Sequence, residues 1–171
     1  KKDLKYFNFL ESKINKYGIG YDIHSFDFKS KKKLKLCGVS INYYPLKSHS
    51  DGDVGYHAIC DSIFGALGIG DIGQFFKNNN PKWKNISSKI FLEFAKEKID
   101  KFNAKINNID INFICEKPII SIYSKKMIIN IAKILKIDKS LINIKATTNE
   151  KIGFIGKGEG IAAESIISIS L

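Results

Sequence analysis

Hydrophobic and polar residues form strand-like patterns in five stretches of the chain, over residues 17–24, 34–41, 109–114, 142–147 and 160–171. The alternation is clearest where Ile109, Ile111 and Phe113 are separated by Asp110 and Asn112. A period of two places one set of side chains on each face of a sheet. We therefore expect five strand regions.

Three other segments repeat apolar residues every three or four positions, which predicts amphipathic helices. The first covers residues 53–67, opens with acidic residues and stops near Gly68. The second centres on residues 90–102, with Asn85 or Ser87 as its expected N-cap, and the third includes residues 128–135. This order predicts one α/β (α+β) domain over residues 17–171, with a mixed β-sheet packed against helices, after an N-terminal extension over residues 1–16.

Length and composition agree with one domain, because 171 residues that are 44% hydrophobic can build a single core. The formal charge of +11 would attract nucleic acid, a membrane surface or an acidic small substrate. However, all 28 basic residues are Lys, whereas Arg is the usual reader of guanine and phosphate. We interpret the charge as compositional background and expect no nucleic-acid partner.

The cysteines and the apolar runs exclude two further classes of protein. Cys37, Cys60 and Cys115 are odd in number and form no C-x-x-C pair, so neither a disulfide framework nor a thiolate metal site is predicted. No apolar run is long enough to cross a bilayer, and the first residues lack the order of a signal peptide. We expect no membrane partner and a reducing compartment.

All three histidines lie beside acidic residues, in Y-D-I-H at 21–24 and H-S-D-G-D-V-G-Y-H at 49–57. Asp22 and His24 are two positions apart on a predicted strand, so their side chains project from one face. His57, on the predicted helix, would complete a set of two imidazoles and one carboxylate. Such a set suits zinc and leaves a fourth position for a substrate oxygen.

A D-x-H pair alone is common, so the neighbours of His57 matter. Asp53 and Asp61 lie four residues on either side of it, and either is a candidate to accept its second ring proton. The alternative is helix-end electrostatics for Asp53 and ordinary solvation for Asp61.

Three small-residue or hydroxyl-rich stretches are candidates for phosphate binding. The stretch G-I-G-D-I-G at 68–73 is a flexible turn whose amides could hold an anion. The stretch at 156–160 matches neither a Walker A motif nor a dinucleotide fingerprint, so a tight turn explains it. The stretch K-A-T-T-N-E at 145–150 could hold a phosphate and a cation, or be only a polar strand end.

Four of these motifs, in order, resemble the 2-C-methyl-D-erythritol 2,4-cyclodiphosphate synthase family of the non-mevalonate isoprenoid pathway. They are G-Y-D-I-H at 20–24, the histidine stretch at 49–57, L-G-I-G-D-I-G at 67–73, and K-A-T-T-N-E-K-I-G-F-I-G-K-G-E-G-I-A at 145–162. The resemblance implies a phosphorus–oxygen lyase that closes a cyclic diphosphate from a CDP-linked small molecule and releases CMP. It also implies a homotrimer with active sites between subunits.

The resemblance further implies a role for individual residues. Asp22, His24 and His57 match the zinc ligands, Glu150 matches the ligand of magnesium (or manganese), and His49 and Thr148 match catalytic positions. The matched substrate-binding positions are Ser50, Asp61, Asp71, Gly73, Phe76, Asn80, Cys115, Pro118, Ala146, Thr147, Phe154 and Lys157. Among these, Cys115, Pro118, Ala146 and Thr147 fall where the family forms its cytidine pocket, and Lys157 replaces the usual arginine.

Two other functions compete with this interpretation. A zinc-dependent phosphodiesterase or hydrolase needs the same open metal site but uses metal-bound water as its nucleophile. A basic nucleic-acid-binding module with a structural metal is disfavoured by the absence of Arg and by the core-like pattern of the aromatic residues. For the compartment, the resemblance leaves a plastid-type organelle (apicoplast or chloroplast-like), favoured by the N-terminal segment, or a bacterial cytoplasm.

Overall fold

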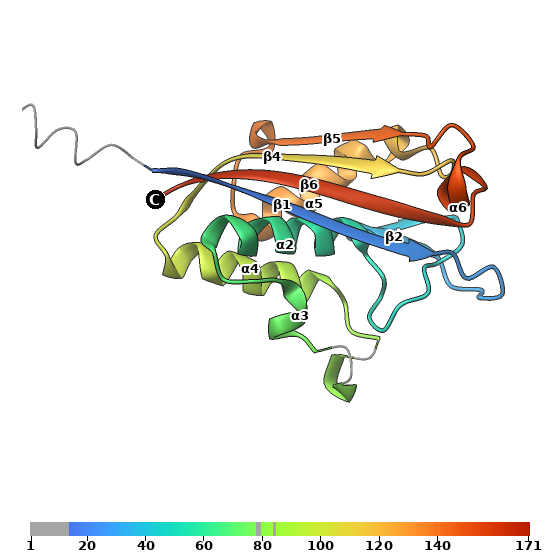
Figure 1. The fold of residues 1–171 in the computed structure, drawn as a ribbon, viewed down its shortest axis with the longest axis horizontal. Helices are drawn as coiled ribbons and strands as arrows, with labels where there is room; N and C mark the ends of the chain where they lie inside the picture. Colours follow the sequence, from blue (N-terminus) through green and yellow to red (C-terminus); the bar gives the residue numbers. More distant parts are fainter. Residues whose placement is uncertain (1–13, 78–79, 84) are drawn as a thin grey trace, which may run out of the picture.

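The computed structural model describes residues 14–77, 80–83 and 85–171 and contains a four-stranded mixed sheet (Figure 1). Its strands are β1 (Asn15–Ser25), β4 (Lys105–Ile114), β5 (Ile142–Thr147) and β6 (Gly160–Ser170), in the order β1-β6-β4-β5. Strands β4 and β5 pair in parallel, and the other pairs are antiparallel. The two short strands β2 (Leu34–Leu36) and β3 (Val39–Ile41) form a separate hairpin.

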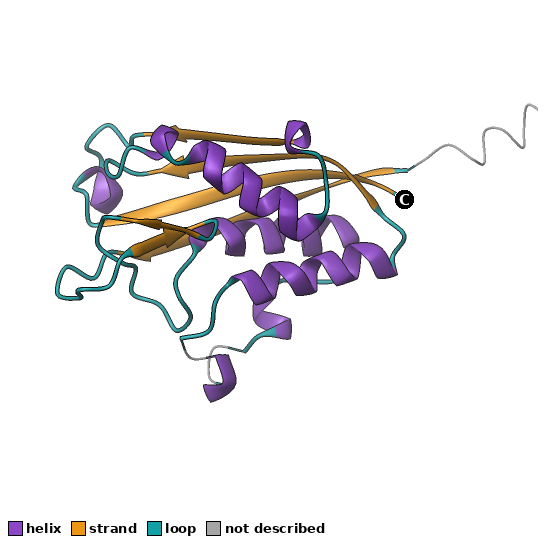
Figure 2. Cartoon of the chain, turned by 180° about the vertical axis from the view of Figure 1, so that it is seen from behind, coloured by secondary structure: helices purple, strands orange, loops and turns teal. Residues whose placement is uncertain are grey.

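Three long helices, α2 (Val54–Leu67), α4 (Lys89–Lys101) and α5 (Ser124–Leu135), lie on one face of the sheet (Figures 1 and 2). The core fills the space between them and includes the fully buried Phe64, Leu92, Phe113 and Met127. The shorter helical segments are α3 (Ile72–Phe75), α6 (Gly153–Gly156), η1 (Pro81–Trp83), η2 (Ile120–Ile122) and η3 (Lys139–Leu141). Within the described ranges, no helix has the length and apolar character to span a membrane.

The predicted α+β class with a mixed sheet against helices is confirmed, as are the three long helices. The strand predicted over 142–147 has those bounds, whereas the region 34–41 divides into the two strands of the hairpin. Residues 1–13 of the predicted N-terminal extension lie outside the described residues, and Asn15 and Lys16 are the first residues of β1.

The ends of α2 and α4 illustrate when local sequence signals suffice to predict a helix boundary. Asp53 caps α2 by accepting a hydrogen bond from the Tyr56 amide, and Gly68 ends the helix with a φ of 71°. The prediction that Asn85 or Ser87 caps α4 is wrong, because the N-cap is Ser88, whose side chain makes no capping hydrogen bond. The Ser88 hydroxyl is occupied by tertiary contacts instead.

Candidate metal centre and substrate site

Strand β1 and helix α2 are in direct contact, and this contact brings the predicted metal ligands together. A Cβ atom at Gly18 would lie 1.9 Å from the Ser62 carbonyl oxygen, and one at Gly20 would lie 2.0 Å from that of Ala58. Only glycine allows this approach. Because Gly18, Gly20, Asp22 and His24 alternate along β1, they share the face that α2 covers.

The three predicted metal ligands converge at the start of α2. Asp22 Oδ2 lies 3.0 Å from His57 Nδ1 and 3.3 Å from His24 Nε2, and the side chains are only 15 to 26% exposed. One ligand atom from each residue lies within 4.8 Å of the other two. These three atoms can therefore contact a single cation.

The charges of this group are strongly coupled. Burial raises the pKa of the Asp22 carboxyl, but the two adjacent imidazoles lower it more, so its pKa lies well below the usual range. Burial lowers the pKa of His57, but the Asp22 carboxylate more than offsets this effect and leaves the pKa above its ordinary value. The ionised Asp22 carboxylate therefore lies next to the readily protonated His57 imidazole. A metal that binds here would take the place of the imidazole proton.

The second ring nitrogen of His57 has a different partner from the ones we expected. His57 Nε2 lies 2.9 Å from Ser88 Oγ. Asp53 is buried and accepts hydrogen bonds from the backbone amides of Cys37 and Gly38, besides that of Tyr56, so it ties the β2–β3 hairpin to α2. The prediction for Asp53 and Asp61 is wrong, because helical spacing cannot reveal a partner that comes from another element.

Asp61 is hydrogen-bonded to the turn at 68–73, which follows α2. Its Oδ1 accepts a hydrogen bond from the Ile72 amide at 2.7 Å, and Asp71 caps α3 through the Gln74 amide. Burial raises the pKa of Asp61, while the bond from Ile72 acts in the opposite direction. Both carboxylates therefore order the turn at 68–73, which contributes Gly73 to the cavity beside the triad.

We call this cavity the β1 cavity, of about 170 Å³; its lining residues are Asp22, His24, Ser48, His49, Ser50, His57, Ile72, Gly73, Phe76, Trp83 and Phe91. It brings together the metal triad and the predicted residues His49, Ser50, Gly73 and Phe76. The predicted Asn80 is adjacent, since its carbonyl oxygen lies 3.3 Å from His49 Nε2. Asn78 and Asn79, the neighbouring part of that loop, lie outside the described residues.

An aromatic cluster on one side of the β1 cavity was only partly expected. The rings of Phe76 and Phe91 lie 4.5 Å apart, Trp83 lies 5.1 Å from Phe76, and Phe91 lies 5.6 Å from His57. Sequence reasoning missed Trp83 and Phe91 as site residues. The position of Trp83, the only tryptophan, beside the asparagine-rich loop was the available signal.

The predicted cytidine-binding residues form a second pocket at the opposite edge of the sheet. This β5 pocket, of about 300 Å³, includes the predicted Cys115, Pro118, Ala146, Thr147 and Thr148; its remaining lining residues are Glu116, Ile119, Ile120, Ser121, Ser124, Ile144 and Lys145. The Thr148 hydroxyl donates a hydrogen bond to Glu150. The β1 cavity and the β5 pocket have no lining residue in common.

The strand register places the two pockets at the same end of the sheet. Asp22 pairs with Ala163, Ala163 with Phe113, and Phe113 with Ala146, so Asp22 and Ala146 occupy one row across all four strands. Three strand spacings give a separation of about 14 Å. Within one chain, the two groups of predicted residues are therefore apart.

The loop between β5 and β6 contains the remaining predicted residues. Phe154 lies in α6, and Lys157 directly follows that helix. Glu150, Phe154 and Lys157 are exposed, and none of them lines the β1 cavity.

Comparison with known proteins agrees with this geometry. The YgbB family model matches residues 15–170. The 2-C-methyl-D-erythritol 2,4-cyclodiphosphate synthase of Ehrlichia chaffeensis is 48% identical over 159 residues, which are 90% of this chain and 92% of that protein. This relative is bacterial, so it favours the bacterial alternative and does not support the predicted plastid-type organelle.

Solved structures match over nearly the whole chain. The CDP complex of IspF from Plasmodium falciparum is 44% identical with a TM-score of 0.81, over 91% of this chain and 96% of that one. The bifunctional IspDF of Campylobacter jejuni is 39% identical with a TM-score of 0.84, over 93% of this chain and 43% of that one. The chain thus belongs to the YgbB family, the 2-C-methyl-D-erythritol 2,4-cyclodiphosphate synthases, and this confirms the resemblance found in the sequence.

Proposed function

We propose that the chain binds zinc through Asp22, His24 and His57 and converts 4-diphosphocytidyl-2-C-methyl-D-erythritol 2-phosphate to 2-C-methyl-D-erythritol 2,4-cyclodiphosphate and CMP. The proposal rests on the convergence of one carboxylate and two imidazoles on the wall of the β1 cavity. This donor set fits zinc and leaves a coordination position for a substrate oxygen. Asp22 Oδ2 also fits, because it is buried, lies 3.0 to 3.3 Å from ring nitrogens of both histidines and makes no well-aligned hydrogen bond to a described residue.

In the proposed reaction, the 2-phosphate attacks the β-phosphorus of the same molecule, and the bond from that phosphorus to the CMP oxygen breaks. The nucleophile is already a phosphate oxygen, so the protein needs no strong base. Its task is to fold the substrate for an in-line displacement and to offset negative charge. Zinc, when bound, supplies a Lewis acid that polarises a phosphate oxygen.

The residues around the triad are suited to position the substrate. His49 and Ser50 line the β1 cavity next to the triad, and we assign them to the substrate phosphates. Phe91 is only 4% exposed and Phe76 9%, so their rings form an apolar wall beside His57. A wall of this kind excludes water from one side of the cavity.

We assign magnesium or manganese to Glu150. One exposed carboxylate fits a magnesium ion that takes its other ligands from phosphate oxygens and water. We assign Thr148 to the charge that develops on the phosphates: its hydroxyl donates to Glu150 in this structure and would turn to a phosphate oxygen when Glu150 binds the metal. Lys157 adds a positive charge nearby in the sequence. The β5 pocket would then bind the cytidine through residues including Cys115 and Ala146.

We further propose that a complete site forms between two chains of a homotrimer. Two observations support this arrangement. The β1 cavity and the β5 pocket are separated by the width of the sheet, so a second chain is needed to bring them close. The sheet face opposite the helices also exposes apolar side chains: Tyr17 is 70% exposed, Ile19 64%, Tyr21 53% and Ile166 50%. A patch of this kind favours burial against a partner.

Incubation of the protein with the proposed substrate, with and without a chelator, tests the function. We expect CMP and the cyclic diphosphate in equimolar amounts, with loss of both after chelation and recovery on addition of zinc and magnesium. Phosphorus NMR of the products identifies the alternative, since a phosphodiesterase would release an opened phosphate monoester. That product, or turnover unaffected by the chelator, would refute the proposal.

A further inference from the structure

Ser88 occupies an unusual position for a serine at a helix start. It is fully buried and stands at the N-cap of α4, where a serine side chain normally accepts a hydrogen bond from the first helical turn. It makes no such bond. Its hydroxyl lies 2.9 Å from His57 Nε2 on one side and donates to Asp51 Oδ1 on the other.

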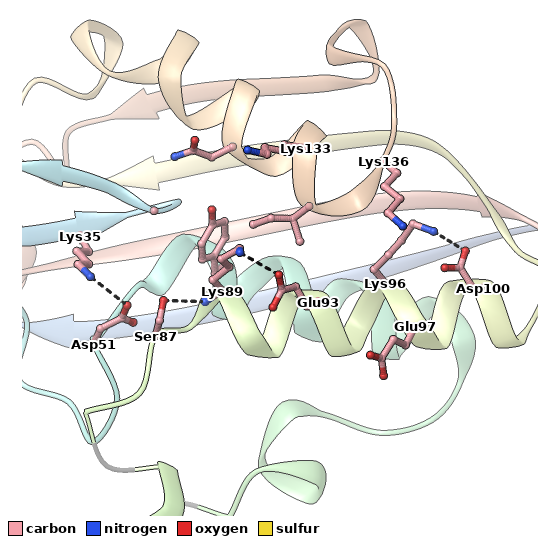
Figure 3. Close-up of a pocket in the computed structure, with 14 residues that line it drawn as sticks. Lys35, Asp51, Ser87, Lys89, Glu93, Lys96, Glu97, Asp100, Lys133 and Lys136 are labelled. Carbon is pink, nitrogen blue, oxygen red and sulfur yellow. Dashed lines mark hydrogen bonds and ion pairs between the residues drawn. The ribbon is translucent and has the colours of Figure 1, made fainter.

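Asp51 is held firmly in place to receive this bond. Its Oδ1 also accepts the Ser88 backbone amide at 3.1 Å, and its own amide donates to the Ile86 carbonyl. Its other oxygen lies 3.9 Å from Lys35 Nζ, and both residues line the pocket beside α4 and α5 that Figure 3 shows. The segment before α2 is thereby fixed to the start of α4.

The direction of these hydrogen bonds determines which nitrogen of His57 carries the proton. An ionised carboxylate can only accept, so the single hydroxyl proton of Ser88 goes to Asp51. The Ser88 oxygen then acts as the acceptor for His57 and keeps a proton on Nε2. A metal would then displace the proton from Nδ1, the nitrogen that faces Asp22, and bind its lone pair.

We infer that Ser88 and Asp51 are positioning residues that fix the ring orientation and tautomer of His57, so that Nδ1 is presented to the metal. The inference rests on the metal part of the proposed function. Partners of this type orient metal-binding histidines in many sites. Ser50 Oγ also lies near His57 Nε2, but at 3.4 Å, so it is the weaker partner.

Three variants separate positioning from a purely structural role. Ser88→Ala removes the acceptor, whereas Ser88→Thr keeps a hydroxyl. Ser87→Ala is the matched control, because Ser87 is exposed, lines the pocket beside α4 and α5 and accepts a hydrogen bond from the Lys89 amide instead of contacting His57 (Figure 3). Metal affinity is measured with Co²⁺ and Zn²⁺ alone, in competition with a chromophoric chelator.

We expect Ser88→Ala to bind both metals about 10- to 100-fold more weakly. We also expect its cobalt absorption spectrum to differ from that of the wild type, because His57 would no longer be held in one orientation. Ser88→Thr should restore most of the affinity, and Ser87→Ala should match the wild type in both measurements. Nitrogen-15 correlation spectra of the zinc-loaded protein should show His57 bound through Nδ1 and protonated on Nε2 in the wild type, and a mixture of Nδ1-bound and Nε2-bound forms in Ser88→Ala.

Wild-type affinity, cobalt spectrum and tautomer in Ser88→Ala would overturn the inference. If Ser88→Ala does not fold, the same measurements are made on Asp51→Asn, which preserves size but can donate to Ser88 and so reverse the hydrogen bonds. Asp51→Asn with wild-type behaviour would then refute the inference. Because substrate is absent from these assays, a wild-type protein that binds metal but forms no cyclic product contradicts only the proposed reaction.

Discussion

The β1 cavity and the loop after β5 both contain predicted site residues, yet these residues differ in burial and contacts. In the β1 cavity, Asp22 and His57 are mostly buried and contact each other across a glycine-lined interface between β1 and α2. In the loop between β5 and β6, Glu150 and Lys157 have exposed side chains.

This difference indicates where each part of the site obtains its order. The metal ligands are positioned by the core of their own chain, so they need no partner to converge. The backbone after β5 is ordered by hydrogen bonds within the loop and to Glu116, whereas the side chains of Glu150 and Lys157 are exposed, and we expect substrate, metal or a second chain to fix them. We expect substitutions of the metal ligands to abolish metal binding. The effect of substitutions in the exposed residues after β5 should depend on whether the chains are assembled.

The largest effect is expected from His57→Ala, which removes one ligand from the preformed group. A catalytic metal contributes several kcal/mol to the transition state, so formation of the cyclic product should fall about a thousand-fold or more. Metal content measured by atomic emission should fall as well. Full metal content together with full CMP release would contradict the assignment of His57.

The next largest effect is expected if the metal ligands of one chain and Glu150 of another chain form one active site. Mixing His57→Ala with Glu150→Gln, each inactive alone, should restore activity after dissociation and reassembly. Random assortment of the two chains in a ring gives about one intact site in four. Each variant carried through the same treatment alone is the control, and no recovery in the mixture would mean that both groups act within one chain.

The dependence of metal affinity on pH is expected to be smaller. The pKa of His57 is raised above 6.5, so below that raised pKa a proton competes with the metal. Affinity for zinc should rise about tenfold per pH unit and level off once the pH exceeds the raised pKa. His49→Gln should show the same profile, because His49 is not among the three converging ligands.

Without metal, the stability of the protein should change with pH in the opposite sense. A raised histidine pKa adds stability that is complete below pH 6.5 and is lost as the pH rises through the folded-state pKa. Thermal unfolding should therefore occur at lower temperature as the pH rises in the metal-free protein, and the difference should shrink when zinc is added. A metal-free protein that becomes more stable over this range would contradict the Asp22–His57 interaction.

The smallest effect is expected in the exposed loop. Ile152 is 70% exposed, so Ile152→Ser should change the free energy of unfolding of the isolated chain by less than about 0.5 kcal/mol. Urea unfolding at low protein concentration measures this value. A larger loss that appears only at high concentration would place Ile152 in the interface between chains.

Much of the fold could be predicted because its signals are local. The Asp53 cap and the Gly68 stop define α2, and periodicity alone identifies β5 with its observed bounds. The start of α4 could not be predicted, since Ser88 has no local mark that distinguishes it from Ser87. The difference between them is a tertiary contact with residues more than 30 positions away.

The parts of the candidate site that depend on local spacing could also be predicted from the sequence, and the parts that depend on strand order could not. The Asp22–His24 pair follows from strand alternation, and His57 is predicted because it ends a short stretch that also contains one other histidine and two aspartates. The separation of Asp22 from Ala146 depends on the strand order β1-β6-β4-β5, which motifs in sequence order do not contain. Sequence spacing likewise predicts a partner for the second ring nitrogen of His57 only from the same helix, whereas the observed partner, Ser88, comes from another element.

The glycines of β1 have a consequence for anyone who would build such a centre into another protein. Copying the two histidines and the aspartate onto a new strand and helix would fail if the recipient strand had side chains at the positions of Gly18 and Gly20, because the helix would be pushed outward and the third ligand would fall short. A designer should therefore first choose a strand with glycines at these two positions and add the ligands afterwards.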